Sequence, residues 1–390
     1  MNKSKHKHRA IIAHGMWGRG GAEAAAMWII SALSETFDVT VYTRCGFDLE
    51  ALNALAGTSL SPEALTVRWA RVEGGLQVGA WTAGRFLRSL HSIAEGFDLC
   101  VSASGILPWG RPALHFLSSI DCDPDLARRL WHGGRIPLKA RISHIVQRLA
   151  YGTLQPQAEG VFVTNSEWLK RQCAHACSGP IEVIHPAVPT LSKGLPWQDR
   201  EDAVLVFGRI SPEKRIEACI QIVELARADG FAGKLVIAGP EGPADYTAQI
   251  RELAETRDWI TVMPNQSGNQ RDVLLGKVRY GLNACLYEAF GISSAEMAAA
   301  GIIVLVPQGT GQDEIVSDPI QQYASELDAS SKLVMLGSNA ALQIRLHERA
   351  HLVRGRYNPA GFVAAVQRVA QKAISFKTEG RATPENPTGP

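Results

Sequence analysis

Hydrophobic residues recur along this 390-residue chain as short runs rich in valine and isoleucine, and longer stretches with helical spacing separate the runs. Such runs are typical of parallel strands buried on both faces, with the helical stretches as their crossover connections. Candidate strands of the first half are 10–13, 39–43, 99–102, 114–117, 160–164 and 181–185, and those of the second half are 203–207, 234–238, 260–263, 280–286 and 302–306. The pattern therefore predicts an α/β protein with two doubly wound sheets.

The segment 186–202 interrupts this pattern, because it is rich in proline and charge and has no sustained period. We place a linker there and expect one Rossmann-like domain over 1–190 and a second over 191–358. Two such domains are expected to face a cleft, which is a preferred place for a ligand. The helical pattern over 359–375 is expected to pack back on the first domain, and the polar residues 376–390 are expected to form a disordered tail.

The composition of the chain narrows the classes of function. A net charge of +2 argues against a nucleic-acid partner that is bound through an overall basic surface. The seven cysteines are scattered and form no CxxC pair, which favours a reducing compartment. No apolar run is long enough to span a bilayer, and no signal peptide is evident. We therefore expect a cytoplasmic protein.

The segment 287–301 (YEAFGISSAEMAAAG) carries the strongest signal for a ligand site. Glu288 falls in a loop, Gly291 frees the backbone, and Ser293 or Ser294 can cap a helix that carries Glu296. Unpaired amides at a helix start suit a diphosphate, and carboxylates on either side suit sugar hydroxyls. The alternative is a pair of exposed glutamates without a ligand.

Two further segments contribute to this hypothesis. In FGRISPEKR (207–215), Arg209 and Lys214 follow a strand and could neutralise a leaving diphosphate, although a solvated basic loop is the alternative. In HGMWGRGGAE (14–23), Gly20 and Gly21 permit close backbone approach to a ligand. Glu23 stands where the third glycine of a dinucleotide fingerprint belongs, so a dinucleotide site is not favoured.

GRxxxEK at 208–214 and ExFGxxxxE at 288–296 resemble the signature pair of glycosyltransferase family 4, and GGAE at 20–23 adds to the resemblance. Within that family, the segments 280–306, 163–172 and 181–188 are most similar to the α-1,2-mannosyltransferases that extend lipid-linked oligosaccharides. The resemblance implies a GT-B fold and retaining transfer of a hexose, with mannose as the first expectation, in polysaccharide or glycolipid assembly. It also implies a nucleotide-sugar donor, with GDP-mannose first, and a glycan or lipid-linked glycan acceptor. The alternative is a GT-B scaffold that binds nucleotide or glycan without turnover.

The resemblance also implies roles for individual residues. Arg209 and Lys214 hold the diphosphate, Glu296 binds the ribose, and Glu288 contacts the transferred sugar. The implied donor contacts further include the amides of Phe290, Gly291 and Ile292 and the loop residue Asn265. His115 would face the sugar from the first domain, unless it is a histidine of the core. Residues 309–312 (GTGQ) depart from the glycine pair of the family.

The implied mechanism is front-face substitution, in which the leaving phosphate helps to deprotonate the acceptor. Arg209, Lys214 and the helix amides stabilise the departing charge, so no metal and no other cofactor is expected. A hydrolase that uses Glu288 and Glu296 as a carboxylate pair fits less well, because neither residue is placed opposite a water.

Two patterns look like metal sites. HERAH at 347–351 matches the HExxH motif of zinc proteases, but Arg354 replaces the glycine of the extended motif and the downstream glutamates lie in the expected tail. Cys173, His175 and Cys177 lie close in sequence without partners at ligand spacing. We expect neither to bind metal.

The segment 126–158 contains no acidic residue, and its basic residues alternate with apolar ones. This pattern predicts a basic amphipathic surface for an anionic membrane or a lipid diphosphate, at the inner face of the membrane. Its proposed contacts are Arg128, Arg129, Lys139 and Arg141. The alternative is an ordinary helix with a solvated basic side.

Overall fold

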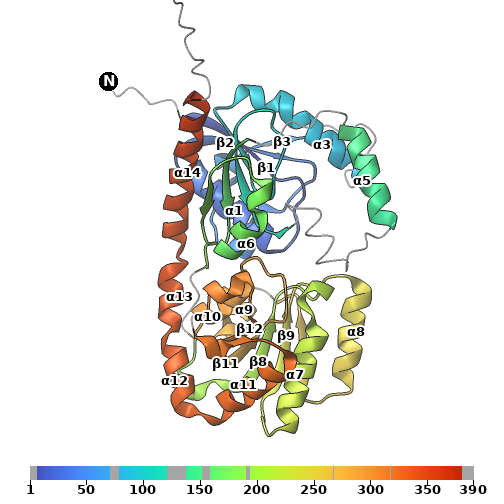
Figure 1. Ribbon diagram of the computed structural model, residues 1–390, viewed down its shortest axis with the longest axis vertical. Coiled ribbons are helices and arrows are strands. Elements are labelled where there is room, and N and C mark those ends of the chain that lie inside the picture. The colour runs from blue at the N-terminus through green and yellow to red at the C-terminus, as the bar shows by residue number, and fades with distance from the viewer. Residues whose placement is uncertain are drawn as a thin grey trace, which may run out of the picture. The chain divides into compact units, whose positions relative to one another are not determined.

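The computed structural model describes residues 7–70, 79–120, 138–151, 159–189, 194–266, 268–316 and 318–379. The chain forms two compact units, of which the first comprises 1–184 and 360–390 and the second comprises 185–359 (Figure 1). The division falls a few residues before the boundary at 190 that the sequence suggests. His185 already belongs to the second unit, where its ring bonds to Glu314.

The first unit contains a seven-stranded parallel sheet in the order β3-β2-β1-β4-β5-β6-β7. The strands are β1 (His8–Ala13), β2 (Phe37–Thr43), β3 (Thr66–Trp69), β4 (Leu99–Ser102), β5 (Ala113–Leu117), β6 (Gly160–Thr164) and β7 (Ile181–Val183). The edge strand β3 has no apolar run, because its side chains are largely exposed, and the sequence therefore does not predict it. The helices are α1 (Gly21–Ser34), α2 (Leu49–Ala56), α3 (Ala80–Ile93), α5 (Leu138–Tyr151), α6 (Glu167–Cys173) and α14 (Pro359–Glu379).

Helix α14 belongs to the first unit, although it follows the whole second unit in sequence. Its apolar side is buried at Val366 and Val369, and Gln367 donates to the carbonyl of Ala32 at the end of α1. Lys372 donates to Glu182 of β7. The helix continues to Glu379, one turn beyond the expected start of the tail at 376, and residues 380–390 lie outside the described part.

The second unit contains a six-stranded parallel sheet in the order β10-β9-β8-β11-β12-β13. The strands are β8 (Glu201–Phe207), β9 (Lys234–Gly239), β10 (Ile260–Pro264), β11 (Val278–Leu282), β12 (Ile303–Pro307) and β13 (Gln322–Tyr323). The helices are α7 (Ile216–Ala228), α8 (Ala244–Glu255), α9 (Gly268–Leu275), α10 (Ile292–Ala299), α11 (Glu326–Ser338), α12 (Ala340–Glu348) and α13 (Ala350–Arg356). Only the two-residue strand β13 is absent from the sequence-based expectation for this unit.

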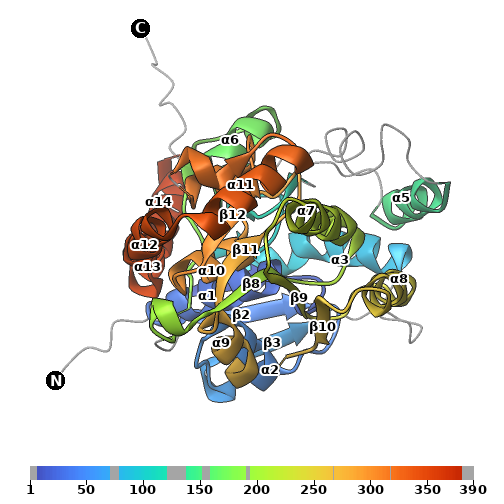
Figure 2. The same cartoon turned by 90° about the horizontal axis from the view of Figure 1, so that it is seen from below.

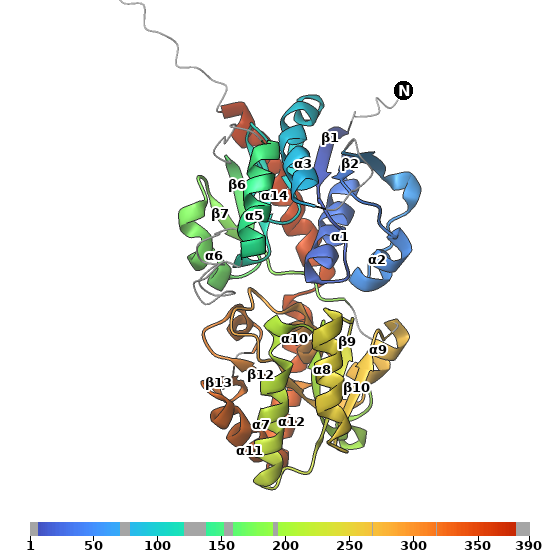
Figure 3. The same cartoon turned by 90° about the vertical axis from the view of Figure 1, so that its right-hand side faces the viewer.

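Alternate residues of β8 face opposite layers of helices, as the pleat of a strand requires. Val204 and Val206 belong to the core cluster that includes α7, α8 and α11, whereas Leu205 belongs to the cluster that includes α10. The sheet accordingly lies between α7 and α8 on one side and α10 on the other (Figure 2, Figure 3). Burial on both faces explains why the central strands are uninterrupted apolar runs.

The strand order places two loops of the second unit together. The chain leaves β8 towards β9 on one side, and β11 pairs with the other side of β8. In doubly wound sheets this switch point opens a crevice beyond the carboxyl ends of the strands. The loops that follow β8 and β11 carry Lys214 and Glu288, respectively.

Candidate functional site

Helix α10 begins at the site with an uncapped first turn. Gly291 occupies the N-cap position with a left-handed φ of 94°, and no side chain caps the helix. A Cβ at this position would lie 2.9 Å from Cγ of Gln312, so both the conformation and the available space require glycine. The first amides of a helix have no intrahelical acceptor, and here they remain available to an anion.

Neither serine caps this helix, contrary to the sequence-based expectation. Ser294 is buried, accepts a hydrogen bond from Asn283, and donates to Oε1 of Gln312 at 2.6 Å. Gln312 lies in the loop that departs from the family pattern, and its neighbour Gly311 donates its amide to the carbonyl of Glu288. A Cβ at Gly311 would lie 1.8 Å from the carbonyl oxygen of Ala289. This loop therefore supports the Glu288 loop from behind.

The turn after β8 approaches the start of α10. A Cβ at Gly208 would lie 3.7 Å from Oγ of Ser293 and 4.0 Å from Cε of Lys214. The ammonium of Lys214 donates a short hydrogen bond to the carboxylate of Glu288, and the two side chains are 22% and 19% exposed. Burial alone would lower the pKa of Lys214, but Glu288 more than offsets it, and the pKa is raised. Lys214 is therefore a fixed positive charge at neutral pH.

Arg209 adds an uncommitted cation to the same turn. Its side chain is exposed, and it forms no ion pair with any residue that the structure describes. A guanidinium in this state is free to bind a phosphate with two parallel hydrogen bonds.

Glu296 is buried in α10 and is 7% exposed. Burial raises the pKa of its carboxyl to about 7, and Arg271 of α9 opposes this shift from 3.6 Å while Asp272 adds to it. Arg271 is a site residue that the sequence did not indicate, because it lies in a polar helix without a motif. The pair places a buried carboxyl that can form hydrogen bonds beside the helix start.

Asn265 and His185 extend the surroundings of the site. Asn265 is exposed with a φ of 55°, and both its side-chain oxygen and its amide nitrogen bond to Glu241. The expected contact of Asn265 with the nucleotide sugar stays a prediction, since its side-chain atoms already stabilise a turn. His185 bonds to Glu314 at 2.7 Å, and its ring centroid lies 5.6 Å from that of Phe290. The sequence did not single out this contact, which steadies the loop before α10.

Comparison with known families bears on this arrangement. Residues 188–336, which include the turn after β8 and the Glu288 loop, match the family described as Glycosyl transferases group 1. This segment of the chain is therefore similar to the group 1 glycosyltransferases. Its structural elements supply each of the predicted donor residues except Gly20 and Gly21, which lie in the first unit.

Relatives and solved structures agree with this assignment. The GDP-Man:Man(3)GlcNAc(2)-PP-Dol α-1,2-mannosyltransferase of Candida glabrata is 27% identical over 170 residues, which are 39% of this chain and 33% of that protein. The chain spans about a third or less of the length of the curated relatives it matches. The predicted resemblance to such mannosyltransferases is confirmed at this low identity.

Two crystal structures share the fold over nearly the whole chain. WaaG, a glycosyltransferase involved in lipopolysaccharide biosynthesis, is 14% identical, with 95% of this chain and 99% of that chain covered and a TM-score of 0.66. HepE from Anabaena, in complex with UDP and glucose, is 13% identical, with 94% and 100% covered and a TM-score of 0.66. The expected GT-B architecture of two Rossmann-like units is thereby confirmed.

Outside the matched segment, His115 lies in the core of the first unit. It sits within β5, is 1% exposed, bonds through Nδ1 to Oγ of Ser102 at 3.0 Å, and stacks on Phe162. Burial lowers the pKa of His115 to about 4, with the backbone of Glu159 opposing the shift, so the ring is neutral at pH 7. Nε2 has no hydrogen-bond partner among the described residues. This geometry is that of a core histidine, and its contact with a sugar stays a prediction.

The glycine-rich turn of the first unit has an ordinary backbone conformation at Gly20 and Gly21. Gly20 is the N-cap of α1 in an extended conformation that any residue adopts, and Gly21 is the first helical residue. Glu23 accepts a hydrogen bond from the amide of Gly18 and thereby holds the turn. His14 follows the end of β1, is 4% exposed, and has Nδ1 3.3 Å from Oγ of Ser104. Burial lowers the pKa of His14, and the nearby charge of Glu23 offsets only part of this shift. The donor role of the two glycines stays a prediction.

Several other sequence signals have structural uses. Nδ1 of His347 bonds to the carbonyl of Gly301, and its ring packs against Trp197. Within the described ranges, no group of three potential ligand side chains could hold a metal ion.

Cys173 is disulfide-bonded, whereas Cys177 and four other described cysteines are free thiols. The disulfide of Cys173 was not indicated by the sequence, since spacing in sequence does not reveal which thiols approach one another in the fold.

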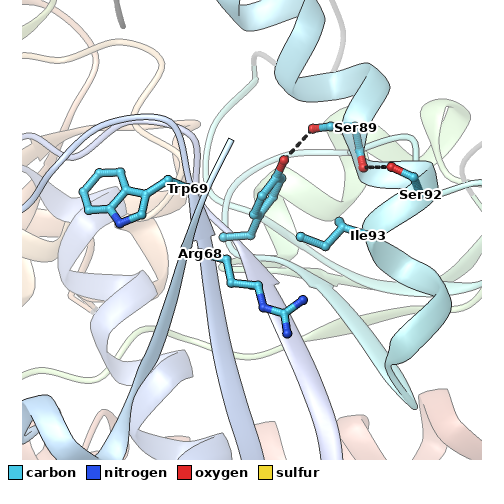
Figure 4. Close-up of a pocket in the computed structure, with 6 residues that line it drawn as sticks. Arg68, Trp69, Ser89, Ser92 and Ile93 are labelled. Atoms are coloured by element: carbon cyan, nitrogen blue, oxygen red, sulfur yellow. Dashed lines mark hydrogen bonds between the residues drawn. The ribbon is translucent and has the colours of Figure 1, made fainter. Parts of the chain in front are cut away.

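A hollow of about 630 Å³ lies between β3 and α3 (Figure 4). Tyr42 and Ser89 line it and bond to each other at 2.6 Å, and Arg68 and Trp69 border it from β3. It contains none of the predicted site residues, and its hydroxyls are already paired. We assign it no ligand.

The basic segment is described only in part. Arg128 and Arg129 lie outside the described residues, whereas Lys139 and Arg141 lie on α5, where Arg141 is exposed. Across the described ranges, no helix has the length and apolar composition required to cross a membrane.

Proposed function

We propose that this protein is a retaining hexosyltransferase of glycosyltransferase family 4 that transfers a hexose from a nucleotide diphosphate sugar to a lipid-linked glycan. One observation carries the proposal. In the segment that is similar to the group 1 glycosyltransferases, the Lys214–Glu288 pair and the uncapped start of α10 meet at the switch point of the sheet. A site of this kind presents fixed positive charge and free amides beside a carboxylate, which suits a phosphate group joined to a sugar.

The diphosphate is held by groups that remain available once the fold has formed. Lys214 has three N–H donors and commits one to Glu288, so the others can reach a phosphate oxygen. Arg209 supplies a second cation, and the amides around Phe290, Gly291 and Ile292 supply neutral donors. Glu296 would accept from the ribose hydroxyls, and Asn265 would border the base.

Transfer breaks the bond between the anomeric carbon and the diphosphate oxygen, and an acceptor hydroxyl forms the new bond on the same face of the sugar. The hydroxyl proton passes to the leaving phosphate. Positive charge at Arg209 and Lys214 stabilises that phosphate as its charge grows, and the proposal includes no metal ion and no other cofactor. Glu288 orients the sugar, and His115 is kept as the candidate sugar contact of the first unit.

The donor is proposed to be GDP-mannose, because the yeast relative is named for GDP-mannose transfer. UDP-glucose is the competing donor, since HepE was crystallised with UDP and glucose. The acceptor is proposed to be a lipid-linked glycan exposed to the cytoplasm, as the diphosphate-dolichol acceptor in the name of the yeast relative suggests.

Release of GDP or UDP from a panel of nucleotide sugars, with a polyprenyl-diphosphate glycan as acceptor, tests the proposal. We expect GDP release from GDP-mannose, and an α-linked product by NMR would establish retention. Glu288→Ala should remove turnover, whereas Glu252→Ala, an exposed residue of α8, should not. If a nucleotide stabilises the fold but no donor is consumed, the protein is a non-catalytic scaffold. If Glu288→Ala retains full turnover, the site is wrongly placed.

A further inference from the structure

Helix α5 presents its most apolar side chains to solvent. Four of its large residues are between 54% and 70% exposed, namely Leu138, Ile142, Ile145 and Leu149. Their spacing of four, three and four residues places them in one stripe along the helix. A helix on the surface of a soluble domain normally turns such a stripe inward, so this helix has the opposite orientation.

The side of α5 that the protein covers carries polar residues and smaller apolar residues instead. Ala150 is buried, and Ser143, Val146 and Gln147 are partly buried. The helix packs beside α3 of the same unit (Figure 3). The exposed stripe is therefore not a consequence of a poorly packed helix, because α5 has a separate face for its own domain.

Positive charge flanks the stripe. Arg141 and Arg148 are exposed and each precedes a stripe residue, so they follow one border of the stripe along the helix. The neighbouring helix α3 exposes Trp81, Arg85 and Arg88 at similar spacing. Neither helix contains an aspartate or a glutamate.

We propose that α5, supported by α3, is a docking surface for the headgroup region of an anionic lipid bilayer. The stripe would enter the boundary between headgroups and acyl chains, and the arginines would reach the lipid phosphates. Charge complementarity favours lipid over a second copy of the chain. A two-fold dimer with antiparallel α5 helices across this face would bring the arginines of one copy against the same arginines of the other.

This surface goes beyond the proposed transfer reaction and does not depend on turnover. It would bring the enzyme to the layer in which a lipid-linked acceptor is anchored. The helix would thereby raise the effective concentration of the acceptor at the enzyme without taking part in the chemical step. The two claims can fail separately, because vesicle binding is measured without donor and donor use is measured without vesicles.

Co-flotation with vesicles tests the proposal. The full chain should float with phosphatidylcholine vesicles that contain phosphatidylglycerol, should remain in the dense fraction with pure phosphatidylcholine, and should be released at about 1 M salt, where screening is strong. Arg141→Gln with Arg148→Gln should weaken partitioning roughly 30-fold, from about 1 kcal/mol for each arginine near an anionic surface. Ile142→Ser with Ile145→Ser should abolish flotation at any salt concentration.

Matched controls are available elsewhere on the surface. Arg171→Gln on α6 removes an exposed cation, and Leu327→Ser on α11 removes a leucine that is 68% exposed. Both control variants should float like the parent protein. All variants should keep the unfolding temperature of the parent and its rate of nucleotide release, measured with a soluble acceptor in the absence of vesicles. Absence of flotation in the parent, or equal flotation in the α5 variants, overturns the proposal. A parent dimer that Ile142→Ser with Ile145→Ser dissociates, without lipid binding, would instead identify a protein interface and also overturn it.

Discussion

Lys214 and Glu288, which lie 74 residues apart in sequence, share a hydrogen bond that joins the turn after β8 to the loop after β11. Each of the two side chains affects the charge of the other. The carboxylate keeps the half-buried ammonium charged, and the ammonium partly neutralises a carboxylate that would otherwise repel a diphosphate. This pair gives the most direct test of the site.

Lys214→Ala should lower kcat by roughly 10² to 10³-fold, the usual loss when one donor to a developing negative charge is removed. It should also lower the free energy of unfolding by about 1–3 kcal/mol, because Glu288 loses its partner in a partly buried place. Turnover assays and urea unfolding measure the two effects. Lys214→Arg restores the charge and should recover most stability but only part of the rate. Unchanged kcat in Lys214→Ala would remove Lys214 from the mechanism.

Glu296 should make the second unit less stable as pH rises. Its pKa is raised from 4.5 to about 7 in the folded state, so the native carboxyl holds a proton that the unfolded chain releases between those pH values. Glu296→Gln should therefore stabilise the protein relative to the parent on the order of 2–3 kcal/mol at pH 8, and by much less at pH 4. Urea unfolding at both pH values measures the difference. A difference that does not change with pH would mean that folding does not shift the pKa of this carboxyl.

His115 should have the opposite effect on the first unit. Its pKa is lowered from 6.5 to about 4, so the unfolded chain takes up a proton between those pH values and the native state does not. Stability from this group is complete above pH 6.5 and is lost as pH falls towards 4, by about 3 kcal/mol. His115→Gln should flatten this slope when unfolding of the first unit is followed by near-UV circular dichroism. An unchanged slope would show that the ring is protonated in the folded state.

Gly291→Ala should disrupt nucleotide binding more than Gly309→Ala does. Both glycines have a positive φ, of 94° and 79°, so both substitutions carry the strain of a left-handed residue, about 1 kcal/mol. Only Gly291 also lacks space, since its Cβ would meet Gln312, whereas nothing lies within 4 Å at Gly309. Calorimetric titration with GDP should show a loss of at least tenfold for Gly291→Ala and little change for Gly309→Ala. Equal losses would place the phosphate away from the start of α10.

The order of apolar runs was sufficient to predict two doubly wound units, because strands buried on both faces must be apolar throughout. Strands that escape this requirement were missed, namely the exposed edge strand β3 and the two-residue β13. The motifs also singled out Lys214, Glu288 and Glu296, and their roles towards a diphosphate and a sugar stay predictions.

Only the tertiary structure determines which side chains contact these residues. Strand order brings Lys214 to Glu288, and packing of α9 against α10 brings Arg271 to Glu296. The segment after β7 brings His185 to Glu314, which is 129 residues away in sequence. Burial of His115 depends on its neighbours in adjacent strands, which local sequence does not contain. The amphipathic pattern of α5 was visible in the sequence, but the direction of its apolar stripe was not. A periodic pattern defines the faces of a helix, and only contacts with the rest of the chain determine which face turns outward.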